Sequence, residues 1–228
     1  MKTINRIRNN SSLVSSFSIF LFLVSLLAVS LLLGRVFIDD QPLDRFLVTI
    51  FYFTTQSNVI IFLIITLYLL KKFKQPWFKI IALIGLIDIV VTGLFFHLFL
   101  ASYMNSVGFM QQVLHTVVPI LYLIFYFVIL EDTFRIRDIW ISLIHPVIYA
   151  LSIYTYIHPI FGQLISRVMV DLPGASYVYP FLDPATYEHG YRGLLLFNFG
   201  ILIPTILIIS LLLIYLKSRL EKFLINSQ

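Results

Sequence analysis

The run LVTIFYFTTQSNVIIFLIITLYLL, residues 47–70, decides which fold this sequence can adopt. It is long enough to cross a hydrocarbon core of about 30 Å as one α-helix. Its first half nevertheless carries five consecutive polar side chains, from Thr54 to Asn58. Polar groups are costly in lipid, so within a span they tend to face the bundle interior and mark functional sites. The run therefore predicts both a membrane helix and a candidate site.

The whole chain has the composition of a multi-pass membrane protein. Of its 228 residues, 60% are hydrophobic and 12% charged, and the mean hydropathy is +0.96. Soluble domains carry about twice that share of charge. The chain has no cysteine, which excludes disulfides and thiol chemistry. The net charge of +5 does not predict a nucleic-acid partner, because the basic residues stand at the ends of apolar runs.

Six apolar runs are long enough to span a membrane. They cover residues 13–34, 47–70, 80–101, 111–130, 140–160 and 193–216. The runs are continuous rather than alternating, which favours helices over the strands of a barrel. We therefore predict an all-α polytopic bundle of six transmembrane helices, which forms a single domain over residues 1–228 in the cell membrane.

The distribution of Lys and Arg predicts the orientation. Twelve of the sixteen basic residues lie in the two terminal tails and in the loops at 71–79 and 131–138. Since cytoplasmic segments are enriched in Lys and Arg, both termini are expected in the cytoplasm. Residues 161–192 then form an outer loop rich in aromatic side chains. Its Tyr179 and Phe181 are candidates for capping the outer mouth and binding substrate, or alternatively for anchoring the loop at the membrane interface.

Polar residues from four predicted helices fall at a similar depth in the outer leaflet. With a rise of 1.5 Å per residue, Thr54 lies about 10 Å and His115 about 6 Å below the outer helix ends. His97 and Asn198 fall in the same layer. A threonine hydroxyl can attack an ester when a neutral histidine takes its proton, so Thr54 or Thr55 with His115 forms a candidate nucleophile and base. Alternatively, these side chains only hydrogen-bond their own or neighbouring helices.

Supporting roles are expected for four further polar residues. Asn58 or Asn198 is a candidate donor to a developing oxyanion, and His97 could orient reacting groups. Asp88 falls near the middle of its span, where it is either the partner of a histidine or a proton site in a carrier. No metal or cofactor is predicted, because the histidines lack the spacing of metal ligands and no phosphate-binding loop occurs.

Three segments in order resemble a known family. They are FYFTTQSN (51–58), LHTVVP (114–119) and YVYPFLDP (177–184). Together they resemble the androgen-induced and androgen-dependent TFPI-regulating membrane proteins, and more closely their bacterial six-span relatives. The resemblance implies a membrane hydrolase with a threonine nucleophile and a histidine, which in the animal members acts on fatty acid esters of hydroxy fatty acids.

Carried over to this chain, the resemblance assigns the histidine to His115, since Thr116 and Pro119 match the pattern. The threonine is Thr54 if the aromatic lead-in is aligned and Thr55 if the spacing to Asn58 is aligned. Thr54 is favoured. The first hypothesis is therefore a lipid esterase whose substrate is a lipid ester. The alternative is a non-enzymatic carrier or lipid-binding membrane protein in which Asp88 relays protons. Neither hypothesis fixes the oligomeric state.

Overall fold

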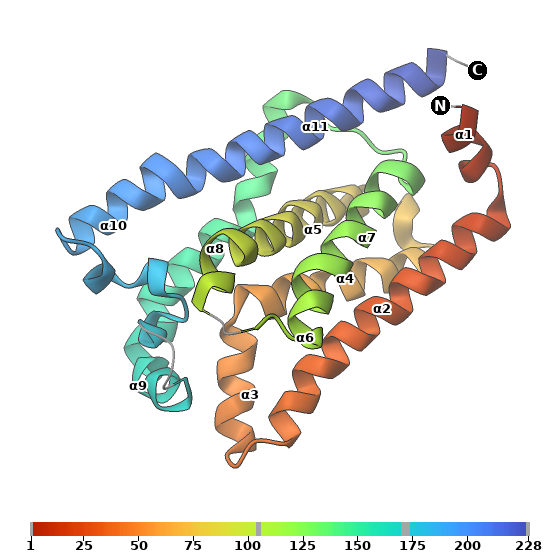
Figure 1. The fold of residues 1–228 in the computed structure, drawn as a ribbon. Helices are drawn as coiled ribbons and strands as arrows, with labels where there is room; N and C mark the ends of the chain where they lie inside the picture. Colours follow the sequence, from red (N-terminus) through yellow and green to blue (C-terminus); the bar gives the residue numbers. More distant parts are fainter. Residues whose placement is uncertain (1, 104–105, 170–173, 227–228) are drawn as a thin grey trace.

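The protein is an all-α polytopic membrane bundle, as predicted. The computed structural model describes residues 2–103, 106–169 and 174–226, and within these ranges every regular element is helical (Figure 1). By length and composition, five helices can cross a membrane, and a sixth span is counted if one sharply bent pair of helices is taken as a single span. The span count of six therefore depends on that bent pair.

The helices follow the predicted apolar runs closely. A short α1 (Lys2–Arg8) precedes the spans, and the bent pair is α3 (Pro42–Phe51) and α4 (Phe53–Leu69). One of the other spans is α2 (Ser11–Phe37), and another is α5 (Pro76–Phe95), which is extended to Leu100. A third span joins α6 (Phe109–Gln112) and α7 (Val118–Ile124) and ends at Ile129. The last two spans are Ile136–Val168, which contains α8 (Ile144–Ser152) and α9 (His158–Val168), and Tyr191–Asn226, which contains α10 (Tyr191–Phe197) and α11 (Ile203–Asn226).

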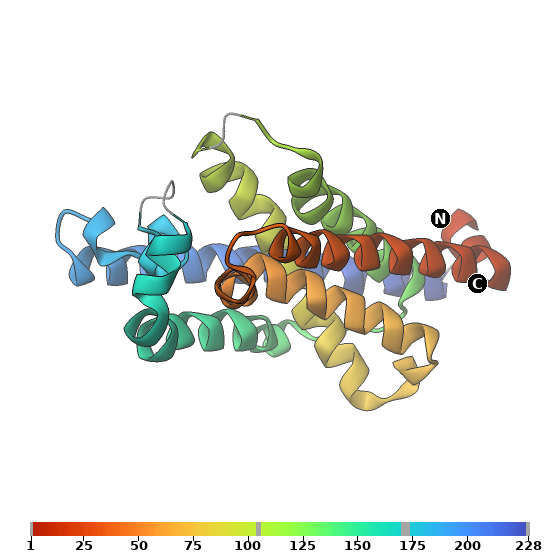
Figure 2. The same ribbon diagram turned by 90° about the horizontal axis from the view of Figure 1, so that it is seen from below.

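The helix predicted over 47–70 is broken at Tyr52. There the backbone is extended, with φ −70° and ψ 132°, and α3 and α4 meet at 78° (Figures 1 and 2). The break frees carbonyl groups in the last turn of α3. The Tyr149 hydroxyl donates to the Phe51 carbonyl at 3.0 Å, and Gln56 Nε2 donates to the Ile50 carbonyl at 3.1 Å. Neighbouring side chains thus stabilise the bend. The prediction of one continuous helix over 47–70 is wrong at Tyr52.

The outer loop is shorter than predicted, because α9 continues to Val168. Residues 170–173 of the predicted loop lie outside the described residues. From Gly174 onward the chain forms short 3₁₀ turns, and Tyr177, Val178 and Tyr179 are buried. These side chains pack with α3, α8 and α9 in a second apolar core, separate from the main core between α2, α4, α5 and α7. The loop is therefore part of the packed structure.

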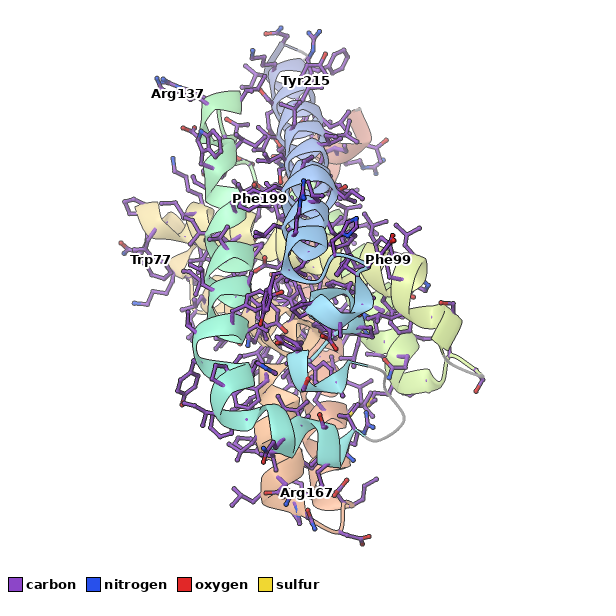
Figure 3. The ribbon with its side chains drawn as sticks, turned by 90° about the vertical axis from the view of Figure 1, so that its left-hand side faces the viewer. Trp77, Phe99, Arg137, Arg167, Phe199 and Tyr215 are labelled. Atoms are coloured by element: carbon purple, nitrogen blue, oxygen red, sulfur yellow. The ribbon has the colours of Figure 1, made fainter. Side chains whose placement is uncertain are left out.

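The two ends of the chain lie together at one end of the bundle (Figures 1 and 2). Arg8 of α1 contacts Glu221 of α11 at 2.6 Å. Arg137 and Arg167 stand at opposite ends of one long helix, while Phe99 and Phe199 project from the side of the bundle (Figure 3). An apolar flank between charged ends suits a membrane-embedded bundle. The cytoplasmic location of the termini stays a prediction from the charge distribution.

Candidate functional site

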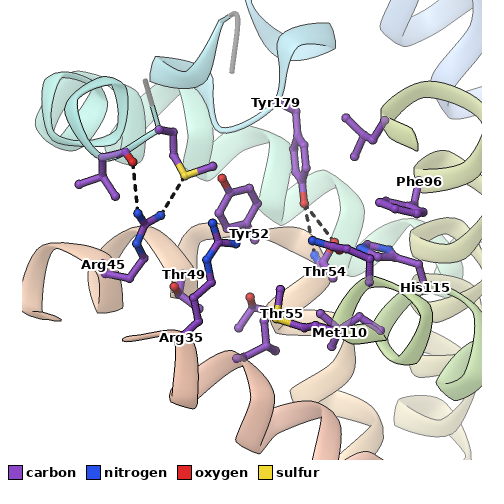
Figure 4. Close-up of a pocket in the computed structure, with 16 residues that line it drawn as sticks. Arg35, Arg45, Thr49, Tyr52, Thr54, Thr55, Phe96, Met110, His115 and Tyr179 are labelled. Atoms are coloured by element: carbon purple, nitrogen blue, oxygen red, sulfur yellow. Dashed lines mark hydrogen bonds between the residues drawn. The ribbon is translucent and has the colours of Figure 1, made fainter. Parts of the chain in front are cut away.

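The principal candidate site is a cavity of about 360 Å³ near the junction of α3 and α4. Its walls come from the C-terminal part of α2, the bent pair, the segment around His115, the end of α9 and the loop that carries Tyr179 (Figure 4). Thr54, Thr55 and His115 all line it. The structure therefore brings the three candidate catalytic residues to one cavity. We call it the polar cavity for its Arg, Thr, Gln and His side chains, although apolar groups form the larger part of its surface.

The two threonines lie in the first turn of α4 because the break at Tyr52 starts a new helix there. The first N–H groups of a helix have no intrahelical acceptor. The Thr54 N–H donates to the Tyr179 hydroxyl oxygen at 3.3 Å, and Thr54 Oγ1 lies 3.4 Å from the same oxygen. Thr55 Oγ1 is buried and has no hydrogen-bond partner among the described residues. The turn thus brings both threonines to the cavity wall, with the Thr54 N–H held by the Tyr179 hydroxyl.

Backbone features of two helices position His115. It lies in a π-helical turn, Val113–Val117, and Pro119 has no N–H for the His115 carbonyl four residues earlier. Gly93 of α5 passes that carbonyl so closely that a Cβ there would lie 2.9 Å from its oxygen. The imidazole stacks on Phe96, with ring centroids 3.8 Å apart. These contacts fix the ring beside the cavity.

The hydrogen bond of His115 determines which ring nitrogen can act as a base. Nδ1 lies 3.4 Å from the Thr92 carbonyl oxygen, which can only accept. Neutral His115 therefore carries its proton on Nδ1 and has a lone pair on Nε2. No hydrogen bond joins His115 to Thr54 or Thr55 within the described part of the chain. The three side chains share the cavity, but their catalytic roles stay predictions.

Asn58 is occupied by backbone groups. Its Nδ2 donates to the Thr54 carbonyl at 2.9 Å and to the Leu114 carbonyl at 3.4 Å, which uses both of its N–H donors. Asn58 links α4 to the segment of His115 and does not line the cavity. Both Asn58 donors are thus occupied in this arrangement, and its expected role as an oxyanion donor stays a prediction.

His97 and Asn198 do not reach the cavity, although their predicted depth placed them beside it. His97 is exposed on the flank, where its Nε2 lies 3.0 Å from Thr116 Oγ1. Asn198 donates to the Leu194 carbonyl of its own helix at 3.0 Å. Depth along a helix was predictable for both residues, but the direction of each side chain was not.

Asp88 and His145 form a close pair away from the cavity. Asp88 is fully buried, and its Oδ2 lies 2.8 Å from His145 Nδ1. Of the two roles expected for Asp88, this geometry agrees with that of a histidine partner. His145 was not among the candidate site residues predicted from the sequence. A buried carboxylate needs a partner, so Asp88 was itself the signal that could have identified His145.

A second, apolar cavity of about 70 Å³ adjoins the first. Phe181 lines it together with residues of α5, α8 and α11. Four residues line both cavities: Thr54, Phe96, Leu100 and Tyr179. The predicted substrate-contacting residues Tyr179 and Phe181 therefore both lie at cavities, and Thr54 stands where the polar and the apolar cavity meet.

Two guanidinium groups line the polar cavity. Arg45 donates to Asp39 Oδ2 at 2.7 Å and to the Val168 carbonyl at 3.4 Å. Arg35 forms neither a hydrogen bond nor an ion pair with any other described residue. A hydrogen bond from the Gln41 backbone, and then Arg45, holds the pKa of the Asp39 carboxyl below its usual range. Asp39 is therefore ionised at neutral pH and orients Arg45, while Arg35 is available to an anionic group.

Tyr179 is a hydrogen-bond donor over a wide pH range. Burial raises the pKa of its hydroxyl, and this outweighs the opposite effect of the hydrogen bonds from Thr54. The phenol therefore keeps its proton at neutral pH. Its oxygen accepts from the Thr54 N–H, so its own O–H can donate to Thr54 Oγ1 or to a bound ligand.

Comparisons with models of protein families, with curated proteins and with solved structures found no match to this chain. The resemblance to the androgen-induced and androgen-dependent TFPI-regulating proteins therefore stays a prediction based on three short segments.

Proposed function

We propose that the protein is an intramembrane esterase that cleaves lipid esters, with Thr54 as nucleophile and His115 as general base. The observation that carries the proposal is the shared cavity, where both threonine hydroxyls accompany a histidine whose Nε2 lone pair is free in the neutral form. A nucleophilic hydroxyl and a neutral imidazole are the minimum for acyl transfer at neutral pH.

In the proposed reaction, Thr54 Oγ1 attacks the acyl carbon and its proton passes to His115 Nε2. The intermediate collapses, the C–O bond to the alcohol breaks, and the alcohol leaves with the proton from His115. Water then attacks the acyl-threonine ester while His115 accepts its proton. The carboxylic acid is released and Thr54 recovers its hydrogen. The oxyanion is stabilised by the Tyr179 hydroxyl and by amide N–H groups of the first α4 turn.

The position of Thr54 favours it over Thr55 as nucleophile. Thr54 lines both cavities, so an acyl chain in the apolar cavity would bring its carbonyl carbon to the Thr54 hydroxyl. Thr55 lines only the polar cavity. Arg35 and Arg45 on the polar side suit a substrate with an acidic group, as in fatty acid esters of hydroxy fatty acids.

The carrier hypothesis has less support. It needs Asp88 to exchange protons with a transported ligand, but Asp88 lines neither of these cavities and lies against His145. Proton-dependent uptake of a ligand into liposomes that contain the protein, abolished by Asp88→Asn, would support the carrier hypothesis instead.

Labelling of the purified protein with a fluorophosphonate tests the esterase directly. The wild type should label, and mass spectrometry should find the adduct on Thr54. Thr54→Ala and His115→Ala should lose labelling, while Thr55→Ala should retain it. Thr66→Ala is the matched control, because Thr66 lies on the same helix and only donates to its own Phe62 carbonyl at 2.7 Å. A wild type that fails to label, or three variants that all label normally, would contradict the proposal.

A further inference from the structure

Gln56 connects the two halves of the bent helix pair to His145 of α8. Its Nε2 donates to the Ile50 carbonyl at 3.1 Å, across the break, and its Oε1 lies 3.0 Å from His145 Nε2. The amide orientation is determined by chemistry, since only the NH₂ end can donate to a carbonyl. Oε1 must therefore accept, and His145 Nε2 must carry a proton.

This tautomer limits the protonation of the buried pair. His145 Nδ1 lies 2.8 Å from Asp88 Oδ2, and Asp88 is fully buried. A deprotonated Nδ1 facing a carboxylate at this distance would put two lone pairs in contact, so one of the two groups must carry a further proton. The pair is neutral overall whether that proton is on the imidazole or on the carboxyl. Burial of a net charge in the bundle is thereby avoided.

Among the described residues, only His145 is recorded as an ion-pair partner of Asp88. The sequence of α4 contains no Asp, Glu, Lys, Arg or His. The nearest titratable group of α7 is Tyr122, whose hydroxyl donates to the Ala82 carbonyl at 3.0 Å. From α11, Lys217 and Glu221 pair with each other near the end of that helix.

We infer that Asp88, His145 and Gln56 are positioning residues that fix the 78° bend and thereby the Thr54 turn. The chain of contacts runs from α5 through α8 to α4 and ends on the last turn of α3. The His145 ring also stacks on Phe53, the first residue of α4, with centroids 5.1 Å apart. That these contacts support catalysis rests on the proposed esterase function. That they set the bend does not.

The bend can be measured without any activity. The chain has no cysteine, so Leu43→Cys on α3 and Leu63→Cys on α4, both exposed, give one defined spin-label pair for a distance measurement in nanodiscs. A single narrow distance is expected for this background. Gln56→Met and His145→Leu should broaden or shift it, because the carbonyl of Ile50 and the ring of His145 lose their partners.

Two variants serve as controls for the distance measurement. Asp88→Asn should keep the wild-type distance, since an Asn N–H can donate to a neutral His145 Nδ1. Gln112→Met should also keep it, because Gln112 accepts from Thr116 on the exposed flank. Wild-type distances in Gln56→Met and His145→Leu would overturn the inference. A distance disturbed equally in Asp88→Asn would overturn the neutral, one-proton pair.

Histidine ¹⁵N spectra test the tautomer independently. The chain has five histidines, and the resonance of His145 is assigned by its loss in His145→Leu. Protonated Nε2 is expected for His145. An unprotonated Nε2 would contradict the inferred hydrogen bond from His145 to Gln56 Oε1. In the esterase assay, Gln56→Met should lower kcat roughly 10- to 100-fold with little change in KM, since misplacement of about 1 Å costs that much. If the wild type has no esterase activity but the distances change as expected, only the proposed function fails.

Discussion

Gly93 faces the backbone carbonyl of His115 at a distance that leaves no room for a side chain. A Cβ at position 93 would lie 2.9 Å from the His115 oxygen and 3.4 Å from Pro119. Backbone atoms on both sides of this contact cannot rotate away. The approach of α5 to the π-helical turn is therefore set by the absence of a side chain at Gly93, and with it the position of the His115 ring.

Gly93→Ala should displace His115 and lower esterase activity roughly 10-fold or more, because catalytic geometry tolerates little displacement. Alanine normally stabilises a helix by about 1 kcal/mol relative to glycine, but here the clash opposes that gain. Gly200→Ala is the control, since a Cβ at position 200 would have no neighbour within 4 Å. Equal activity in the two variants, measured with a fluorogenic ester, would contradict the positioning role of Gly93.

Tyr179→Phe should slow the reaction of Thr54, since it removes the hydroxyl that lies 3.4 Å from Thr54 Oγ1. Loss of one oxyanion donor typically costs about 10²- to 10³-fold in kcat. Apolar packing of the ring should persist, so KM should change little. Tyr191→Phe is the matched control, because Tyr191 is exposed and bonds only Tyr177, at 3.3 Å. A higher KM with unchanged kcat would mean that Tyr179 binds substrate without stabilising the oxyanion.

The pH profile of kcat should rise with pH and then stay level. His115 must be neutral to accept a proton, so activity should increase as the imidazole loses its charge. Burial raises the pKa of the Tyr179 hydroxyl, so this donor should stay protonated to at least pH 9 and no alkaline fall is expected there. A fall between pH 8 and 9 that disappears in Tyr179→Phe would contradict the raised pKa.

Arg35→Gln should weaken binding of acidic esters. Arg35 lines the polar cavity and, among the described residues, has no carboxylate partner. We expect KM for an ester that carries a free carboxylate to rise roughly 3- to 10-fold, the effect of one exposed charge-assisted contact. The methyl ester of the same substrate should show no change. An equal increase for both substrates would mean that Arg35 does not recognise the acid.

Glu221→Gln should destabilise the end of the bundle where the termini meet. Glu221 contacts Arg8 and Lys217 at 2.6 Å, and all three are largely buried. Both cations also donate to the Leu130 carbonyl. Removing one partner of a buried ion pair costs about 3–5 kcal/mol, since it leaves uncompensated charge.

Thermal unfolding in detergent would measure this loss as a lower Tm. Arg219→Gln, which removes an exposed contact to the Tyr215 hydroxyl, should leave Tm nearly unchanged. The double variant Lys217→Met with Glu221→Gln should lose less stability than the sum of the two single variants, because the residues are in contact. Additive losses would contradict a coupled cluster.

The apolar runs predicted the spans well because lipid imposes length and continuity on the sequence itself. The break at Tyr52 was not predictable in that way. The stretch FYFTTQS contains neither Pro nor Gly, so nothing local interrupts the helix there. At the bend, Gln56 donates to the Ile50 carbonyl, and Tyr149, nearly a hundred positions away, donates to the Phe51 carbonyl. Side-chain contacts of this kind are not visible in periodicity.

The candidate site was likewise predictable only in part. Spacing and depth predicted that Thr54, Thr55 and His115 approach one another, and they line one cavity. Depth alone also suggested His97 and Asn198, but the rotation of a helix about its axis decides which side chains face inward. In a chain that is apolar on every face, sequence periodicity gives little information about that rotation.

If Thr54 is the nucleophile, as proposed, the meeting of a polar and an apolar cavity there defines the shape of a selective covalent inhibitor. Its electrophile should sit between a short acidic head and a hydrocarbon tail, with the head toward Arg35 and the tail toward Phe181. A compound with the same electrophile but a tail on both sides would leave the guanidinium group of Arg35 unpaired, since Arg45 is already paired with Asp39. Selectivity over water-soluble serine hydrolases would then come from the asymmetry of the molecule rather than from the reactivity of its warhead.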